Sequence, residues 1–261
     1  MRRVLDFNLR HLDAVVAIHR CGSISGASLD VNLSQPALTQ ALAKIEGQLG
    51  RRLFDRQPNG ATPTAAGALF LARAAWALNE IGEAVRTLRR SARLRPIAYP
   101  ERVMSMTQLR SLVAVGRSGS YASGARDLGL SQPSIRRAVK DLELVLGVPL
   151  LVREGRAMRP TAAADRLLRS VRLALAELQA GMDELAALEQ AGAGRITVGT
   201  LPLPRAGLVP RALSIFAQQH PHATITVLEA GYADLLAELR AGGVDVLLGA
   251  LRHPPPTPDV I

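Results

Sequence analysis

Apolar residues recur at helical spacing near the start of the chain, and polar turns separate the segments that they define. A first helix is predicted over residues 9–20 from the spacing of Leu12, Val15 and Val16. A short second helix is predicted over residues 24–30, and a third is predicted to begin after Ser34, which is placed to cap it. The third helix has apolar residues at i, i+3, i+4, i+7 and i+11, namely Leu38, Ala41, Leu42, Ile45 and Leu49.

The same pattern occurs twice. Leu33-Ser34-Gln35-Pro36 recurs as Leu130-Ser131-Gln132-Pro133, a shift of 97 positions (131 minus 34), and about a third of the positions from Leu12 to Ala66 are identical in the second copy. In the first copy Pro58-Asn59-Gly60 lies between two short extended segments, and Asn-Gly is a strong hairpin signal. The chain is therefore predicted to contain two copies of one domain, each with three helices and a β-hairpin wing, which is a winged helix-turn-helix.

A long helix is predicted after each wing, over residues 64–93 and from residue 161 to about residue 190. Each helix has more apolar surface than one small domain can cover, so it either packs on its own wing domain or pairs with another helix. The apolar positions of the first long helix are Leu69, Ala72, Trp76, Ile81, Val85 and Leu88. Those of the second are Leu167, Leu168, Val171, Leu175, Leu178, Met182, Leu185 and Leu188.

The last part of the chain alternates predicted strands and helices. Strands over residues 195–199, 224–229 and 244–248 alternate with helices over residues 208–219 and 232–241. This β-α-β-α-β order predicts a parallel sheet with right-handed crossovers. The fold class is thus mainly α, with two winged helix-turn-helix domains and long linker helices followed by a partial α/β parallel-sheet domain.

These elements give the predicted domain boundaries. The first winged domain spans residues 1–67, its linker helix 68–93, an interdomain linker 94–103, the second winged domain 104–164, its linker helix 165–191, and the partial α/β domain 195–261.

The first copy resembles the DNA-binding domain of LysR-type transcriptional regulators. The residues that carry the resemblance occur in the family's order and spacing, and they are Gly22-Ser23, Ser34-Gln35-Pro36-Ala37-Leu38-Thr39, Ile45-Glu46, Leu49-Gly50, Leu53-Phe54-Asp55-Arg56 and Thr64-Ala65-Ala66-Gly67. The second copy departs from the family at Leu151, at Glu154 in the wing and at Ala164, and the first copy departs at Leu29 and Gln40. Where the second copy has Leu151 and Ala164, the family usually has Phe and Gly.

The partial α/β domain resembles the start of the LysR-type effector domain, a two-lobed module similar to periplasmic binding proteins. Roughly a third of that module is present, so we expect a truncated form of a longer protein. The resemblance also implies that the linker helices pair antiparallel. Because both helices occur in one chain, we predict an intramolecular pseudo-dimer; the alternative is pairing between chains, first helix with first helix. The predicted contacts in reversed order join Leu69, Trp76, Ile81 and Leu88 to Leu168, Leu175, Leu178 and Leu185.

The distribution of charge favours a nucleic-acid partner for the two winged domains. The chain has 32 basic and 22 acidic residues, and nearly all of the basic residues are arginine. Residues 1–100 contain 14 basic and 7 acidic residues, residues 101–200 contain 14 and 10, and residues 201–261 contain 4 and 5. The positive excess therefore lies on the two helix-turn-helix copies, as a phosphate-binding surface requires.

The third helix of a helix-turn-helix enters the major groove with its N-terminal residues at the base edges. Gln can bind adenine and Arg can bind guanine through two hydrogen bonds, whereas wing arginines reach the backbone or the minor groove. For any single position the alternative is a helix cap or a solvated side chain. The candidate DNA-binding residues are Ser34, Gln35, Pro36, Thr39, Gln40, Arg56, Ser131, Gln132, Pro133, Arg136, Arg137 and Arg153.

Thr200 and Pro202 follow the first strand of the partial α/β domain and are candidate effector-binding residues. Ligands of parallel sheets bind at the carboxyl ends of the strands. Thr200 could equally act as a helix cap. We expect no metal site, because His220 and His222 offer too few ligands, and no cofactor.

We therefore predict a bacterial, cytoplasmic, sequence-specific DNA-binding transcriptional regulator without catalytic activity. Its partners would be double-stranded promoter DNA and, in the full-length form, a small-molecule effector. The alternative is an architectural, nucleoid-type protein that binds DNA without sequence preference. The single cysteine, Cys21, is expected to be a buried structural thiol, and we expect neither a signal peptide nor a membrane-spanning segment.

Overall fold

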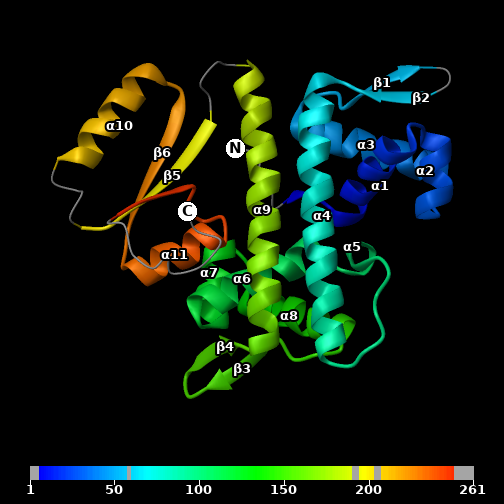
Figure 1. Ribbon diagram of the computed structural model, residues 1–261. Coiled ribbons are helices and arrows are strands. Elements are labelled where there is room, and N and C mark those ends of the chain that lie inside the picture. Colours follow the sequence, from blue (N-terminus) through cyan, green and yellow to red (C-terminus); the bar gives the residue numbers. More distant parts are fainter. Residues whose placement is uncertain (1–5, 58–59, 190–193, 203–206, 250–261) are drawn as a thin grey trace. The chain divides into compact units, whose positions relative to one another are not determined.

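The computed structural model describes residues 6–57, 60–189, 194–202 and 207–249. The chain divides into two compact units, residues 1–185 and residues 186–261. The first unit contains both winged domains (Figure 1).

The first winged domain has the three predicted helices and the wing. Helices α1 (Leu9–Cys21), α2 (Ile24–Val31) and α3 (Gln35–Leu49) are followed by the antiparallel strands β1 (Phe54–Gln57) and β2 (Gly60–Pro63). The Ser23 and Ser34 hydroxyls cap α2 and α3 by accepting the backbone N–H of Gly26 and Ala37. The tip of the predicted hairpin, Pro58-Asn59, lies outside the described residues.

The second winged domain repeats this order. Helices α6 (Met106–Ser118), α7 (Tyr121–Leu128) and α8 (Gln132–Leu146) are followed by the antiparallel strands β3 (Leu151–Glu154) and β4 (Ala157–Pro160). Ser120 and Ser131 cap α7 and α8 as their counterparts do in the first domain. The predicted repetition of three helices followed by a β-hairpin wing is confirmed.

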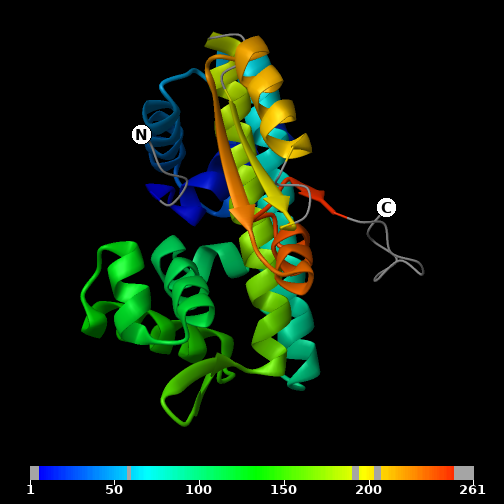
Figure 2. The ribbon, with the colours of Figure 1, turned by 90° about the vertical axis from the view of Figure 1, so that its left-hand side faces the viewer.

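The two long helices, α4 (Ala65–Ser91) and α9 (Ala162–Glu189), lie side by side and antiparallel within the chain (Figures 1 and 2). Their polar contacts run in reversed order. Arg73 of α4 bonds Glu177 and Glu184 near the end of α9, Glu80 accepts from Ser170 at 2.6 Å, and Ser91 accepts from Arg166 near the start of α9. The intramolecular antiparallel pairing predicted from the sequence is confirmed.

The prediction of which residues form the contact between α4 and α9 was partly wrong. Leu69 and Trp76 of α4, both predicted to be in the contact, are 40% and 43% exposed. Leu188, predicted only as part of the apolar stripe of the second long helix, is 55% exposed. The face of α4 that is buried is shifted around the helix and consists of Gly67, Phe70, Leu71, Ala74, Ala77, Leu78, Ile81, Gly82, Val85 and Leu88. On this face Phe70 contacts α9, because a Cβ added at Gly181 would lie 3.2 Å from the Phe70 ring. On α9, Leu168, Leu178 and Leu185 are buried as predicted, and Leu175 is partly buried.

The segment between the winged domains contains a short helix, α5 (Pro100–Val103), where the sequence predicted only a linker. This segment docks on the first winged domain, because Arg102 bonds the Asp13 carboxylate of α1 at 2.7 Å and stacks on the Tyr99 ring. Arg10 of α1 donates to the Arg102 carbonyl at 2.7 Å. The linker is therefore a structural part of the pseudo-dimer.

One hydrophobic core runs through both winged domains and both linker helices. It contains fully buried residues of every part, such as Leu12 of α1, Phe70 of α4, Leu109 of α6 and Leu178 of α9. At one end, Arg89 of α4 also donates to the Leu146 carbonyl at the end of α8 at 2.7 Å. The two winged domains, both on the same side of the α4–α9 pair in Figure 2, thus share a core within one polypeptide.

The second unit contains a three-stranded parallel sheet of order β6-β5-β7. Its strands are β5 (Gly194–Thr200), β6 (Ala223–Glu229) and β7 (Val246–Leu248), and its helices are α10 (Leu208–Gln219) and α11 (Tyr232–Arg240). Leu235 of α11 and Val244 pack against Gly199 of the central strand. The predicted β-α-β-α-β order and parallel pairing are confirmed.

Two further sequence predictions can be compared with the structure. Cys21, expected to be buried, is exposed, because it is the last residue of α1 and lies on the outer face beside the Gly22 cap. Among the described residues, no helix is long and apolar enough to cross a membrane.

Candidate nucleic-acid interface

The N-terminal turn of α3 presents the candidate residues of the first winged domain. Gln35, Pro36 and Gln40 are exposed, and Thr39 is half-buried on the same helix. Ser34 is also exposed and caps the helix, with its hydroxyl 3.4 Å from the Ala37 backbone nitrogen. Because the free N–H groups at a helix N-terminus attract anions, this end can bind a phosphate while the side chains meet base edges.

The N-terminal turn of α8 presents the equivalent surface of the second domain. Ser131 caps the helix by accepting the Ser134 N–H at 3.2 Å. Gln132, Pro133, Arg136 and Arg137 are all exposed. In the described part of the chain, none of the side chains of Gln35, Gln132, Arg136 and Arg137 makes a hydrogen bond or ion pair, so they are available to an external partner. The predicted residues of each domain are thus brought together on one helix end.

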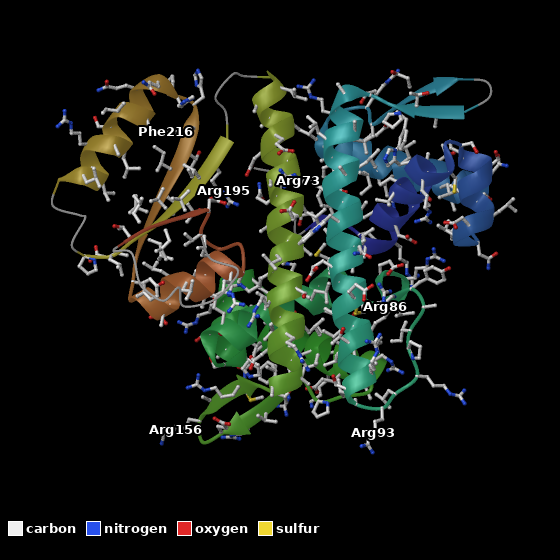
Figure 3. All side chains as sticks on the ribbon, viewed as in Figure 1. Arg73, Arg86, Arg93, Arg156, Arg195 and Phe216 are labelled. Atoms are coloured by element: carbon white, nitrogen blue, oxygen red, sulfur yellow. The ribbon has the colours of Figure 1, made fainter. Side chains whose placement is uncertain are left out.

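The wing arginines differ in what the structure shows. Arg153 of β3 is exposed and donates from Nε to the Gly155 carbonyl at 3.0 Å, which holds it on its own hairpin. Arg56 lies in β1 opposite Ala61, and its side chain lies outside the described residues. The sequence reasoning missed Arg156, which is exposed at the tip of the second wing (Figure 3). Arg156 could have been found from the repeat, because it is a basic residue of the second hairpin at the position that corresponds to Asn59 in the first.

A groove of about 480 Å³ lies between α7, α8 and the wing of the second domain. Four cations line it, and we call it the cationic groove. They are Arg136, Lys140, Arg153 and Arg156. Tyr121 and Gln132 line it as well, so the groove joins the predicted base-reading helix to the predicted phosphate-binding wing. Lys140 was also missed by the sequence reasoning, although it lies one helical turn after Arg136.

One glutamate fixes each wing to its third helix, and it is buried in the second domain and half-buried in the first. Glu143 of α8 accepts the backbone N–H of Leu150 at 2.8 Å and that of Leu151 at 3.1 Å, and it also accepts from Lys140. Glu46 of α3 accepts the Leu53 N–H at 2.7 Å in the same way. Burial favours the neutral form of Glu143, but the hydrogen bonds from Lys140 and the two backbone groups outweigh it, and the pKa of this carboxyl is lowered.

Each wing is also attached to the end of the first helix of its domain. The backbone N–H of Ala61 donates to the Gly22 carbonyl at 2.8 Å, and that of Met158 donates to the Gly119 carbonyl at 2.7 Å. Both glycines adopt the left-handed conformation, with φ of 67° and 72°. Because the wing is attached at its base and at its edge, the wing cations are held at a defined place relative to the third helix.

The candidate effector residues lie in the second unit at the carboxyl end of the central strand. Thr200 ends β5, is buried, and donates its hydroxyl to the Leu201 carbonyl at 3.0 Å. Pro202 is exposed in the following turn. The role of these two residues stays a prediction.

Comparison with known protein families gives matches over most of the chain. The family described as bacterial regulatory helix-turn-helix protein, lysR family, matches residues 9–68 and again residues 106–165. The family described as LysR substrate binding domain matches residues 189–261. The two helix-turn-helix matches coincide with the two winged domains.

Individual relatives are named as regulators of transcription. The HTH-type transcriptional regulator GalR of Pseudomonas putida is 34% identical over 245 residues, which are 94% of this chain and 60% of GalR. An alignment over that share of the chain includes both winged domains. The Hca operon transcriptional activator HcaR of Escherichia coli is 34% identical over 60% of this chain and 52% of its own length. The chain thus spans between about half and 60% of these relatives.

Among solved structures, the oxidized form of OxyR from Corynebacterium glutamicum is 31% identical, and the match covers 57% of this chain and 46% of OxyR, with a TM-score of 0.32.

Proposed function

Because this chain belongs to the LysR family of bacterial regulatory helix-turn-helix proteins, we propose that it is a sequence-specific DNA-binding transcriptional regulator. It binds promoter DNA in the bacterial cytoplasm through two winged domains of one polypeptide. The proposal contains no catalytic step, and the relatives named above are regulators.

The observation that carries this proposal is the pair of equivalent, exposed third helices joined by one core. Each third helix begins at a capping serine, presents Gln and Pro in its first turn, and has its wing fixed by a glutamate that accepts backbone N–H groups at the base of the wing. Antiparallel pairing of α4 and α9 connects the two domains through contacts such as that between Arg73 and Glu177. A single chain therefore supplies the two DNA-binding domains that most oligomeric regulators obtain from two subunits.

The DNA-contacting residues in this proposal are those at the two helix ends and in the wings. Gln35, Gln132, Arg136 and Arg137 contact bases, whereas Arg56 and Arg153 contact the backbone. Ser34 and Ser131 combine capping with phosphate contact, while Pro36, Pro133, Thr39 and Gln40 complete the helix surfaces.

In the second unit we infer contacts to a small-molecule effector at Thr200 and Pro202. Their position at the carboxyl end of the central strand of a parallel sheet supports this role. A thermal-shift screen with organic acids and sugars tests it. A ligand-dependent shift that Thr200→Val abolishes would support the inference, and a shift that Thr200→Val leaves unchanged would contradict it.

Footprinting on fragments of bacterial genomic DNA tests the main proposal. A regulator protects defined sequences in the presence of excess random DNA, and its affinity falls steeply with salt because arginine–phosphate contacts release counterions. Uniform protection of all fragments would instead indicate the architectural alternative. Binding that does not respond to salt would contradict the assignment of the winged domains to phosphate contact.

A further inference from the structure

The two winged domains have the same fold but different chemistry at the surface that faces DNA. The cationic groove of the second domain contains Arg136, Lys140, Arg153 and Arg156. The positions 97 residues earlier in the first domain are occupied by Thr39, Ala43, Arg56 and Asn59. Four cations in the second domain therefore correspond to one in the first.

The third helices show the same contrast. On α8 the exposed residues Arg136 and Arg137 follow Gln132, whereas on α3 the equivalent positions are Thr39 and Gln40. Some charge differences have the opposite sign: Lys44 of α3 corresponds to Asp141 of α8, Arg51 and Arg52 before the first wing correspond to Val148 and Pro149, and Gln57 corresponds to Glu154. All of these positions lie more than a full turn beyond the N-terminus of the third helix, so they do not change the difference in the residues nearest the bases.

These side chains prefer different bases. Arginine forms two hydrogen bonds with O6 and N7 of guanine, and the amide of glutamine forms two with N6 and N7 of adenine. The end of α8 offers two arginines in addition to its glutamine, and the end of α3 offers two glutamines and a threonine. The second domain is therefore suited to guanine, and the first is suited to adenine.

Two identical DNA-binding domains impose two-fold symmetry on their DNA site, because each domain binds the same half-site in the same way. Here the α4–α9 pairing joins two unlike winged domains in one chain. The hydrogen bond from Arg89 of α4 to the Leu146 carbonyl has no identical counterpart, since the residue 97 positions after Arg89 is Ala186. Nothing in the fold requires the two half-sites to be alike.

We propose that the two winged domains recognise unlike half-sites, so that the protein binds an asymmetric operator in one orientation. The second domain reads a guanine-containing half-site and contacts phosphates through the cationic groove. The first domain reads an adenine-containing half-site with Gln35 and Gln40. This inference rests on the function proposed above and adds the form of the operator.

Selection of binding sites from a pool of random duplex DNA, with the whole chain as bait, tests the inference. The wild-type protein should enrich a site with two different half-sites, one containing guanine. Two inverted copies of one half-site would overturn the inference and leave the proposed function intact. Failure to enrich any sequence, with salt-dependent binding to the whole pool, would overturn the proposed function as well.

Two reciprocal triple variants assign the half-sites. Thr39→Arg, Gln40→Arg and Ala43→Lys together should change only the adenine-containing half-site, toward the guanine-containing one. Arg136→Thr, Arg137→Gln and Lys140→Ala together should remove the guanine preference and weaken binding at least about tenfold, since each lost bidentate contact is of that order. Unchanged motifs in both variants would overturn the inference.

Leu144→Gln provides the matched control. Leu144 is 79% exposed on the C-terminal half of α8, outside the cationic groove. This variant should enrich the wild-type motif. Circular dichroism of all three variants establishes that each is folded before its motif is compared.

Discussion

Arg73 of α4, labelled in Figure 3, and Glu184 of α9 are 111 positions apart in the chain, and their side chains meet at 2.6 Å. The same guanidinium bonds Glu177, which lies about two helical turns earlier on α9, at 2.5 Å. This arrangement ties the start of the first linker helix to the end of the second. It marks the antiparallel pairing that makes one polypeptide a pseudo-dimer.

A double-mutant cycle on Arg73 and Glu184 should give a favourable coupling of about 0.5–1 kcal/mol, because both side chains remain partly exposed. Urea unfolding followed by the fluorescence of Trp76, the single tryptophan, measures it. Since the pairing is within one chain, the coupling should not change when the protein is diluted. A coupling that disappears on dilution would point to pairing between chains.

Gly67→Ala should destabilise the first winged domain by roughly 1–3 kcal/mol, because the added methyl group overpacks the contact between α4 and the wing. A Cβ at this position would lie 1.9 Å from the Leu53 carbonyl oxygen. The matched control is Gly47→Ala in α3, where a Cβ would meet nothing within 4 Å. This variant should be stabilised by up to about 1 kcal/mol through helix propensity. Equal effects at the two glycines would exclude the steric explanation.

Glu143→Gln should destabilise the second winged domain by about 1–3 kcal/mol at neutral pH, because the charged acceptor for Leu150 and Leu151 is lost. The pKa of Glu143 is lowered in the folded protein, so its stabilisation is complete above the ordinary glutamate pKa and is lost as the pH falls through the folded pKa. The difference between wild type and variant should therefore shrink on acidification.

Urea unfolding between neutral pH and about pH 3 measures this difference across the ordinary glutamate range. Glu154→Gln is the control, since Glu154 is an exposed carboxylate in the same wing. It should change stability by less than about 0.5 kcal/mol. A pH-independent loss in Glu143→Gln would contradict the role assigned to the charge.

Gln35→Ala and Arg153→Ala should weaken DNA binding in different ways. Loss of a base-reading amide should cost roughly 1–3 kcal/mol on the operator and little on random DNA. Loss of a phosphate contact should weaken binding to both and reduce the salt slope by about one. Salt titrations on the selected operator and on random DNA separate the two. Equal loss on both DNAs for Gln35→Ala would remove its base-reading role.

Local chemistry in the sequence determined the elements and the candidate surface. Ser34-Gln35-Pro36 and Ser131-Gln132-Pro133 specify a cap and a first helical turn within a few residues, so the starts of α3 and α8 were predictable. The repeat itself predicted two equal domains. The resemblance to the LysR family, together with the presence of both linker helices in one chain, predicted their antiparallel pairing. The alternation of strands and helices predicted the parallel sheet of the second unit.

Only the tertiary structure decided which side of each element is used. Periodicity in the sequence shows that α4 has an apolar stripe, but which side of the helix is buried depends on how α9 packs against it. Phe70 contacts Gly181 of α9, and Leu69 and Trp76 are left exposed. The contact of Arg102 with Asp13 and the cationic groove join segments distant in the chain, so no local pattern contains them. Spacing along a chain specifies local geometry, whereas burial and side-chain contact depend on what packs against it.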